Sequence, residues 1–372
     1  MLRIAHLTSV HPRYDTRIFW KECKSLSRAG YDVFLVVADG KGDEINDGIK
    51  IYDVGKPSSR IKRMIKTAKA VFKKGVELDA EIYHLHDPEL LPHGLKLKKK
   101  GKKVIFDSHE FYGLLMQEKQ YIPAIFRKII SNVYMYYEAY VCRRIDAVIQ
   151  VCTVNGNDYF ESRCKKSVFI TNVPVLSGMN PSYKVPFSDR KKVIYIGGLT
   201  CARGITFLIQ ASSSTDVRIV LAGNWETELY YEQVKRMQEF KNVEYIGYLD
   251  NNEKNMVLDD CLAGISTLLN IGEYSQMDTL TTKIYEYMAM GLPIVFSDFV
   301  YPRSLNKKFK FGIGVDPGNP KEIACAIDYL KNNPAEAKQM GERGRELTLK
   351  VYNWEVEEKK LIELYHNLQS KK

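Results

Sequence analysis

Short apolar runs alternate with helical patterns twice along this 372-residue chain, before and after an aperiodic stretch rich in Pro, Ser, Gly and Asn at residues 173–187. The apolar runs cover residues 4–9, 33–37, 82–86, 104–106, 147–151, 192–196, 218–222, 243–246, 264–268 and 293–296. Runs of this length and composition are typical of buried parallel strands. Helical patterns between most of them predict two doubly wound α/β domains.

The aperiodic stretch sets the predicted domain boundaries. We predict a first domain over residues 1–173, a linker over 174–190 and a second domain over 191–353. An amphipathic stretch over 354–372 predicts a last helix that packs back on the first domain. Because ligands bind at the carboxyl ends of strands in open α/β sheets, we expect a ligand cleft between the two domains.

The net charge of +10 lies entirely in the first half. Residues 1–172 contain 30 Lys and Arg against 20 Asp and Glu, concentrated at residues 60–74 and 96–103. In the first of these segments, Ile61, Met64, Ile65, Ala68 and Phe72 recur at helical spacing. Such a helix either lies on an anionic membrane or packs its apolar stripe on its own domain. The basic segments carry no nucleic-acid-binding signature, so no nucleic-acid partner is expected.

Targeting and cysteine patterns favour a cytoplasmic protein, peripheral at most to the inner membrane face. The chain shows no signal-peptide pattern and no apolar stretch of about 20 residues that would span a bilayer. Its seven cysteines are scattered and include no Cys-x-x-Cys pair. This predicts reduced thiols rather than disulfides or a zinc site.

Residues 281–295 carry the strongest local signal. Thr281 or Thr282 is expected to cap a helix that ends at Gly291, with Pro293 opening the next strand. The N-terminus of such a helix suits a diphosphate, and Glu286, one turn in, suits a ribose diol. The alternative is an ordinary amphipathic helix with a solvated Glu286.

Three polar clusters in the first half follow predicted strands. Their candidate side chains are Asp15, Arg17, His86, Asp87, His109 and Glu110. The pattern His84-x-His86-Asp87 raises the possibility of a metal site, but its spacing lacks a further ligand pattern, so no metal is expected. There is also no Asp-x-Asp motif, which would have indicated a metal-dependent enzyme.

The run Glu286-Tyr287-Met288-Ala289-Met290-Gly291-Leu292-Pro293-Ile294 resembles the C-terminal signature of the retaining glycosyltransferases of family 4. That signature is an acidic residue, seven residues, then Glu-Ala-Met-Ala-x-Gly-x-Pro-Val. The resemblance implies the GT-B fold, two Rossmann-like domains facing across a donor cleft, with a nucleotide-sugar donor and no metal cofactor. It assigns Glu286 to the donor ribose. The first acidic position falls on Asp278, one methylene shorter than Glu, with Glu273 nearby.

The family's glycine-rich loop is matched by residues 197–204. Family members have Gly-Arg-Leu followed by Lys-Gly, whereas this chain has Gly198 at the Arg position and Arg203 at the Lys position. Lys283 is therefore expected to supply the missing cation. The implied donor-binding residues are Gly197, Gly198, Arg203, Gly223, Thr281, Thr282, Lys283 and Glu286. The implied catalytic residues are Arg203, Lys283, Asp278 and His109, the last as the family's sugar-contacting histidine, for which His86 is the second match. The residues expected on the acceptor side of the cleft are Asp15, Arg17, His86, Asp87 and Glu110.

The resemblance implies a metal-independent, retaining hexosyltransferase. It would move a sugar from a nucleoside diphosphate to a glycan or lipid-linked glycan, in cell-surface polysaccharide synthesis. Arg203, Lys283 and helix-terminal amides would meet the leaving-group charge, and with no evident carboxylate nucleophile the acceptor would attack from the front face. Two alternatives remain: a nucleotide-sugar 2-epimerase on the same fold, and a catalytically lapsed nucleotide-sugar or membrane-surface binding protein, suggested by Gly198 and Asp278.

Overall fold

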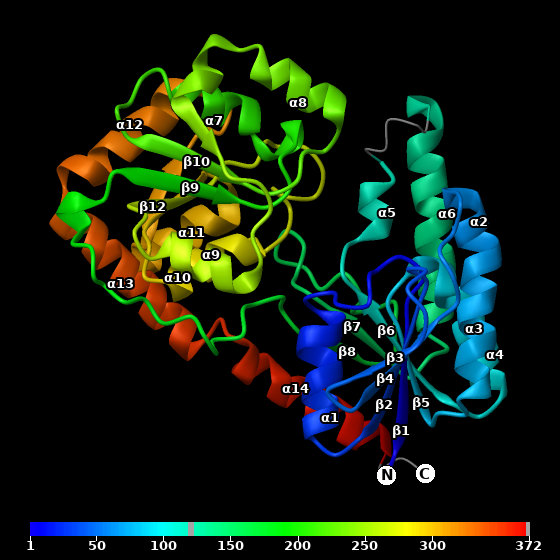
Figure 1. Cartoon of the computed structure of the whole chain (residues 1–372). Helices are drawn as coiled ribbons and strands as arrows, with labels where there is room; N and C mark the ends of the chain where they lie inside the picture. Colours follow the sequence, from blue (N-terminus) through cyan, green and yellow to red (C-terminus); the bar gives the residue numbers. More distant parts are fainter. Residues whose placement is uncertain (118–122, 370–372) are drawn as a thin grey trace. The chain divides into compact units, whose positions relative to one another are not determined.

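A computed structural model describes residues 1–117 and 123–369 of the chain. The chain divides into two compact units (Figure 1). Unit 1 consists of Met1–Asn172 together with the C-terminal stretch from Glu355, and unit 2 of Val173–Trp354. The last helix, α14 (Trp354–Gln369), thus returns to the unit that the N-terminal half forms.

Unit 1 is built on an eight-stranded sheet in the order β3-β4-β2-β1-β5-β6-β7-β8. Its strands are β1 (Arg3–Leu7), β2 (Asp32–Val37), β3 (Glu44–Asn46), β4 (Ile49–Asp53), β5 (Ile82–Leu85), β6 (Lys103–Ser108), β7 (Ala147–Gln150) and β8 (Ser167–Phe169). Among these described strands, only the pairing of β3 with β4 is antiparallel. The strands around β1 are fully buried apolar runs, which is why their sequence pattern predicts parallel strands.

Helices cover both faces of this sheet. They are the continuous helical stretch Ile18–Arg28, which ends in α1 (Lys24–Arg28), the stretch Arg60–Glu77 from α2 (Arg60–Lys62) to α3 (Ala68–Glu77), α4 (Leu91–Lys99), α5 (Tyr112–Leu115), α6 (Ala124–Cys142) and α14. The crossovers through α3, α4 and α6 step in one direction along the sheet, so right-handed connections place them on one face. There α4 contacts both α3 and α6.

Unit 2 has a six-stranded, wholly parallel sheet in the order β11-β10-β9-β12-β13-β14. Its strands are β9 (Lys192–Ile196), β10 (Arg218–Ala222), β11 (Val243–Tyr245), β12 (Ala263–Ser266), β13 (Ile294–Ser297) and β14 (Gly312–Val315). Its helices are α7 (Ile205–Ala211), α8 (Glu228–Lys235), α9 (Asn251–Leu258), α10 (Thr282–Ala289), α11 (Val300–Phe309), α12 (Pro320–Asn332) and α13 (Pro334–Lys350). Two apolar clusters, one on each side of the sheet, form its core.

Each sheet has a point where the strand order reverses. In unit 1, β2 lies on one side of β1 and β5 on the other, and in unit 2, β10 and β12 flank β9 in the same way. Doubly wound sheets bind their ligands outside the strand carboxyl ends at such a point. The loops after β1, β5, β9 and β12 are therefore where functional groups are expected.

All ten predicted strands are strands in the structure, with bounds shifted by at most two residues. The sequence missed β3, β4, β8 and β14, which are short, charged or glycine-containing strands toward the sheet edges. The sequence has an aromatic-rich helical pattern over residues 121–144, which corresponds to α6, and the first two residues of this pattern lie outside the described residues. No helix in the described ranges combines the length and apolar character that crossing a bilayer requires.

Candidate functional site

A buried cluster of histidines and carboxylates lies at the strand reversal of unit 1. His6 belongs to β1, His84 to β5, Asp107 to β6, and His86 and His109 follow the ends of β5 and β6. Adjacent parallel strands bring these side chains together because their registers align His6 with His84 and Leu85 with Phe106. The sequence therefore brings five titratable groups together on β1, β5 and β6 and just after the carboxyl ends of β5 and β6.

Asp107 organises the accessible part of this cluster. Its carboxylate accepts hydrogen bonds from Arg17 Nε and Nη2 at 2.9 and 3.0 Å, and it lies 3.0 Å from His109 Nε2. Burial opposes the charge of Asp107, but Arg17 and His109 hold its pKa well below the ordinary value. Asp107 is thus a fixed negative charge that orients the His109 ring, which remains partly exposed.

Behind His109 the imidazoles bond to one another. His86 Nδ1 lies 3.2 Å from His109 Nε2, and His86 Nε2 lies 2.9 Å from His6 Nδ1. His84 Nδ1 is hydrogen-bonded to the Tyr365 hydroxyl of α14 at 2.8 Å. Burial lowers the pKa of His86 to about 4 and holds the pKa values of His6 and His84 well below 6.5. These three rings are therefore neutral at physiological pH.

Glu22 closes the cluster from the helix Ile18–Arg28. Its Oε1 lies 3.1 Å from Arg17 Nε, while Oε2 lies about 4 Å from His6 and His84. Burial, then the neighbouring Asp107, raises the pKa of Glu22 well above its ordinary value. Sequence reasoning missed Glu22, although its spacing from Phe19 and Leu26 places it on the buried stripe of that helix.

Two groups within the described residues bring together enough ligand atoms for a cation. They are His6, Glu22, His84 and His86, and His86, Asp107 and His109. Both ring nitrogens of His86 bond to neighbouring rings and His84 Nδ1 bonds to Tyr365, which is a metal-free explanation for these atoms. His6 Nε2 and His84 Nε2 have no hydrogen-bond partner among the described residues. The expectation of a metal-free protein stays a prediction.

The loop after β1 is fixed by Asp87 and Asp15. Asp87, fully buried, accepts hydrogen bonds from Thr8 Oγ1 at 2.9 Å and the Ser9 amide at 2.6 Å. Asp15 Oδ1 accepts from the amides of Arg17 and Ile18 at 2.8 and 2.9 Å, at the start of the helix. Both side chains thus hold the loop in place.

The predicted acceptor-side residues therefore separate into two groups. Arg17, expected at the edge of a cleft, is buried, because its guanidinium is engaged by Asp107, Glu22 and the Ile170 carbonyl. His86 and Asp87 are also buried. Glu110 is exposed, and His109 and Asp15 are partly exposed. His109, Glu110 and Asp15 are the ones that a ligand can reach.

In unit 2, the predicted glycine-rich loop follows β9 at the strand reversal. Gly197 has φ +135°, and Gly223, after β10, has φ +138°. A Cβ on Gly223 would lie 1.9 Å from the Gly197 carbonyl oxygen. The loops after β9 and β10 therefore lie too close together for a side chain at Gly223. The positive φ of both residues also favours glycine.

Arg203 and Lys283 converge on this loop. A Cβ placed on Gly197 would lie 3.2 Å from Arg203 Nη1 and 3.3 Å from Lys283 Nζ. A Cβ on Gly198 would lie 3.1 Å from Arg203 Nη1, so the glycine at the family's Arg position leaves room for the guanidinium of Arg203. The two cations that the sequence predicts as a pair are brought together.

Lys283 is buried in an unusual state. Its Nζ lies 3.7 Å from the centre of the Tyr195 ring and has no hydrogen-bond partner among the described residues. Burial, then the nearby Arg203, holds the pKa of Lys283 well below 10.5, although Glu286 opposes this. An unpartnered buried amine beside a guanidinium is poised to receive an anion.

Helix α10 carries Lys283 and Glu286. It starts at Thr282 with Thr281 at the N-cap position, but the Thr281 hydroxyl bonds to Ser266 Oγ at 3.3 Å instead of capping an amide. At its other end, Gly291 has φ +68° and the Leu292 amide reaches the Tyr287 carbonyl at 3.0 Å, the bond that closes a Schellman turn. The first turn of α10 faces the loop after β9, because Lys283 in this turn reaches Gly197.

Glu286 has a partner that the sequence did not reveal. Lys254 Nζ of α9 donates to Glu286 Oε1 at 2.6 Å, and both side chains are partly exposed.

Asp278 lies near Tyr301, whose pKa is raised first by burial and also by the charge of Asp278. Glu273 is buried and its carbonyl starts the turn at Gln276.

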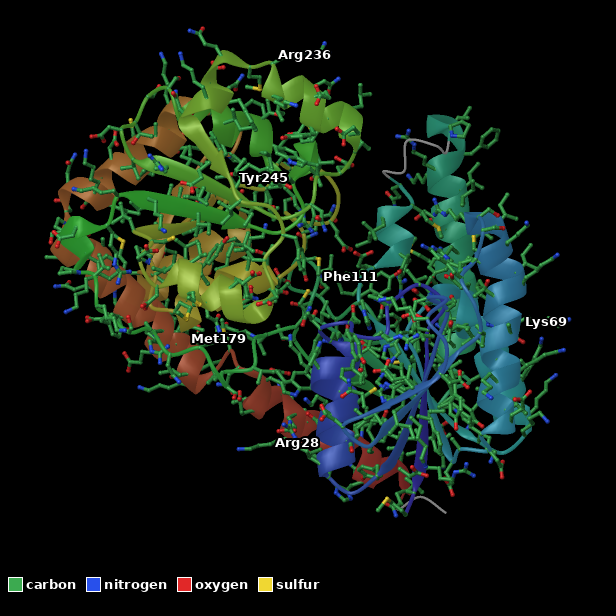
Figure 2. The ribbon with its side chains drawn as sticks, viewed as in Figure 1. Arg28, Lys69, Phe111, Met179, Arg236 and Tyr245 are labelled. Carbon is green, nitrogen blue, oxygen red and sulfur yellow. The ribbon has the colours of Figure 1, made fainter. Side chains whose placement is uncertain are left out.

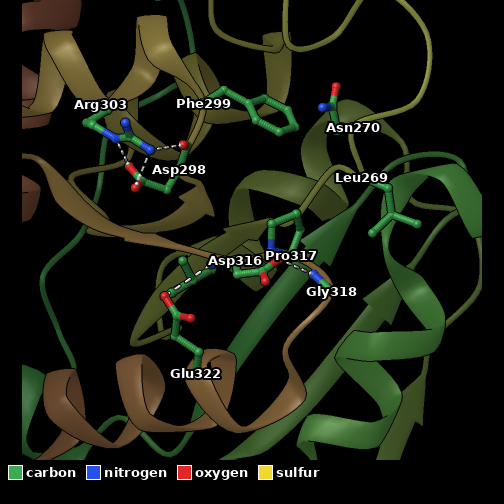
Figure 3. Close-up of a pocket in the computed structure, with 10 residues that line it drawn as sticks. Leu269, Asn270, Asp298, Phe299, Arg303, Asp316, Pro317, Gly318 and Glu322 are labelled. Atoms are coloured by element: carbon green, nitrogen blue, oxygen red, sulfur yellow. Dashed lines mark hydrogen bonds and ion pairs between the residues drawn. The ribbon is translucent and has the colours of Figure 1, made fainter.

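A separate hollow of about 410 Å³ opens at the carboxyl ends of β12, β13 and β14 (Figure 3). Its polar walls are the Asp298–Arg303 ion pair and the Asp316 loop, which Glu322 holds by accepting the Asp316 amide at 3.1 Å. The sequence indicated none of its lining residues: Leu269, Asn270, Asp298, Phe299, Arg303, Val315, Asp316, Pro317, Gly318 and Glu322. The Leu269 amide donates to the Ala202 carbonyl, which joins the hollow to the glycine-rich loop.

Two family descriptions match the chain. Residues 17–162 match glycosyltransferase family 4, and residues 182–347 match glycosyl transferases group 1. Among curated proteins, a D-rhamnosyltransferase of Pseudomonas aeruginosa is 23% identical over 40% of this chain and 38% of its own length. The alpha-D-kanosaminyltransferase of Streptomyces kanamyceticus is 23% identical over 48% of this chain and 46% of its own. The matches thus span about half the length of the curated relatives or less.

Solved structures extend the fold likeness to the whole chain. Sucrose-phosphate synthase from Thermosynechococcus elongatus superposes with a TM-score of 0.80 at 16% identity, over 100% of both chains. An Anabaena protein crystallised with UDP-glucose superposes with a TM-score of 0.72 at 13% identity, over 99% of this chain and 100% of that one. At these identities the likeness establishes the fold, GT-B, with two Rossmann-like units.

Proposed function

This chain belongs to the GT-B glycosyltransferases of the family 4 type, and from that premise we propose that it transfers a sugar from a nucleoside diphosphate donor. The acceptor is a glycan or a lipid-linked glycan of a cell-surface polysaccharide. The transfer takes place at the cytoplasmic face of the membrane, with retention of anomeric configuration and without a metal.

The observation that carries the proposal is the convergence of Lys283 and Arg203 on Gly197, beside the first turn of α10. A diphosphate here gains two cations and the positive end of a helix. Leaving-group charge grows in the transition state, so the same groups that bind the donor lower the barrier. The Anabaena protein of the same fold has been crystallised with UDP and with UDP-glucose, which supports a nucleotide sugar as the donor.

Unit 1 contributes a further candidate group, His109, which Asp107 orients and which is partly exposed. We assign His109 to the transferred sugar, where its ring donates a hydrogen bond to a hydroxyl. The acceptor hydroxyl attacks from the face that the diphosphate leaves, and a donor phosphate oxygen takes its proton. Asp15 and Glu110 are the carboxylates exposed for acceptor hydroxyls.

The lapsed-protein alternative rests on Gly198 and Asp278. Lys283, which lies beside Gly197 together with Arg203, compensates for the first departure, because it supplies the second cation at the loop. This favours an active enzyme. The requirement for an acceptor distinguishes transfer from the epimerase alternative, because an isomerisation proceeds without an acceptor.

The test is a panel of UDP-, GDP- and ADP-sugars scored by thermal shift, since a ligand at about 100 times its Kd adds about 2.7 kcal/mol of stability. Mass spectrometry then follows acceptor-dependent transfer. Arg203→Ala should lower kcat by about 10²-fold or more. Arg218→Ala, which removes an exposed arginine of the same unit, should leave kcat unchanged. Isomerised sugar without acceptor, or donor binding without transfer to any glycan, would establish one of the alternatives instead.

A further inference from the structure

Helix α6 of unit 1 presents an apolar face that the described residues leave uncovered. Eight large side chains along it are between 37% and 80% exposed. They are Ile125, Phe126, Ile129, Ile130, Val133, Tyr136, Tyr137 and Tyr140. At 100° per residue their spacing confines them to about 140° of the helix circumference. Apolar residues on a protein surface are usually scattered, so a contiguous face of this kind marks an interaction site.

The opposite side of α6 packs on its own unit. Ser131, Glu138, Ala139, Val141 and Cys142 are buried there. Glu138 is the single acidic residue between Pro123 and Arg144 in the sequence. It is engaged by the hydroxyls of Tyr134 and Tyr159, each at 3.0 Å, so it places no charge on the exposed face.

The sequence left two alternatives open for the basic segment of residues 60–74, packing on its own domain or lying on an anionic membrane. The structure shows packing for the C-terminal half of the segment and an uncovered apolar stripe in the N-terminal half. Ala68 and Val71 are fully buried and Phe72 stacks on His93, so the C-terminal half packs on unit 1. Ile61, Met64 and Ile65 in the N-terminal half are instead 72%, 49% and 67% exposed. They form a second uncovered apolar stripe. Both this stripe and the start of α6 follow strand carboxyl ends on the sheet face that α4 shares with α3 and α6.

Exposed charge on the two helical segments is positive, and the acid that pairs with Arg63, Glu89 at 3.0 Å, is largely buried. Residues 60–74 contain seven Lys and Arg and no Asp or Glu. Lys62, Lys66, Lys69 and Lys73 are exposed, and Figure 2 shows Lys69 pointing away from the body of unit 1. On α6, Lys128 is exposed, and the guanidinium of Arg144 lies 3.5 Å from the centre of the Tyr140 ring.

We propose that the apolar face of α6 and the Ile61–Met64–Ile65 stripe together form a surface that inserts into an anionic lipid bilayer. Apolar stripes with lysine and arginine beside them and no exposed acid are the composition of helices that lie in a membrane interface. Ile125 to Val133 would enter the acyl region. Tyr136, Tyr137 and Tyr140 would lie at the headgroup level, where amphipathic rings are favoured. The lysines of residues 60–74 supply the attraction to anionic headgroups.

This membrane surface is independent of the transfer reaction, so it is tested without donor or acceptor. The full chain is sedimented with vesicles of phosphatidylcholine containing about one third phosphatidylglycerol, and with pure phosphatidylcholine. We expect binding to the anionic vesicles that weakens with salt and is at least about tenfold weaker on the neutral vesicles. Absence of binding to the anionic vesicles would overturn the proposal.

Two variants separate the contributions. Replacing Ile125, Ile129, Val133 and Tyr136 with Gln should reduce binding by at least about tenfold at every salt concentration, because the inserted area is lost. Replacing Lys62, Lys66 and Lys69 with Gln should remove most of the salt dependence. The matched control replaces Leu229, Met256 and Val300 with Gln, which are equally exposed apolar residues of unit 2, and should bind as the parent does.

Circular dichroism verifies that each variant is folded. Sedimentation velocity addresses the rival occupant, a second copy of this chain. If the parent is a dimer that the α6 variant converts to a monomer while vesicle binding is unchanged, the face is a subunit interface and the membrane proposal fails. Transfer activity plays no part in either outcome, so failure of the proposed enzyme function leaves this test intact.

Discussion

Lys254 Nζ donates to Glu286 Oε1 at 2.6 Å, so the carboxylate proposed to hold the donor ribose already has a lysine partner. A carboxylate has lone pairs for about four hydrogen bonds, so Oε2 can accept ribose hydroxyls while Oε1 keeps Lys254. Glu286→Ala should weaken nucleoside diphosphate binding by about 2–3 kcal/mol. Lys254→Ala should cost less than about 1 kcal/mol, because the pair is partly exposed. Calorimetry with the diphosphate measures both, and equal losses would assign the effect to the ion pair instead of the ribose.

Lys283 should trade stability for function. Its buried amine has no hydrogen-bond partner among the described residues, which costs about 1–3 kcal/mol in the free protein. Lys283→Met should therefore raise the free energy of unfolding at neutral pH and abolish transfer. Because burial and Arg203 hold the pKa of Lys283 well below 10.5 and a bound anion raises it, donor binding should take up a proton at pH values between these two pKa values. Calorimetry in buffers of different ionisation enthalpy detects this uptake, and a Lys283→Met variant that is less stable than the parent would contradict the account.

His109 should contribute to turnover more than to donor affinity. His109→Ala is expected to lower kcat by about 10²-fold, with nucleoside diphosphate affinity unchanged. Asp107→Asn should lower kcat as well, because the ring loses the charge that orients it. His366→Ala, an exposed histidine of α14, is the control. A kcat that survives His109→Ala would remove this residue from the reaction.

The histidine cluster predicts a loss of stability in acid. In the folded chain His6 and His84 have pKa values well below 6.5 and His86 of about 4, whereas in the unfolded chain all three titrate near 6.5. Between about pH 6.5 and 4 the unfolded state therefore binds more protons, and stability falls as pH falls.

Each histidine contributes at most about 1.4 kcal/mol per pH unit. The raised pKa of Glu22 acts in the opposite sense, since the folded state binds its proton first. Asp87 and Glu138, whose pKa values are raised, act in the same sense as Glu22, and His93, whose pKa is lowered to about 4, acts in the same sense as the three histidines. The contribution of the cluster is therefore measured by the change in slope when one of its histidines is removed. Calorimetric unfolding at several pH values measures this slope, and His84→Leu should make it shallower.

Chelation should leave transfer unchanged. The clusters around His86 contain the chemistry of a cation site, but both ring nitrogens of His86, the residue that the two clusters share, are already within hydrogen-bond distance of His6 and His109. Assays with and without EDTA, each followed by metal analysis of the protein, check this expectation. Loss of turnover in EDTA that one divalent metal restores would show that the histidines are ligands.

Much of the fold could be predicted from the sequence, because strands and helix ends leave patterns that involve only neighbouring residues. Apolar strand runs and Gly291 needed only neighbouring residues to interpret, and Arg203 and Lys283 followed from a motif with fixed spacing. Contacts between distant residues were not accessible in this way. The burial of Arg17 depends on Asp107, 90 residues away, and the partner of Glu286 comes from a helix with no motif. The exposed face of α6 was not predicted either, because a sequence does not show which apolar stripe of a helix is left uncovered.

The bond between His84 and Tyr365 joins positions 281 residues apart, which has a consequence for the order of synthesis. Unit 2 is one continuous stretch, Val173–Trp354, and has all of its residues once Trp354 has been made. Unit 1 starts first but finishes last, since its histidine cluster and its Tyr31 packing await Tyr365. On the ribosome the N-terminal half therefore waits, incompletely packed, while the second unit forms. A nascent chain halted after Trp354 would carry a complete unit 2 and an unfinished unit 1.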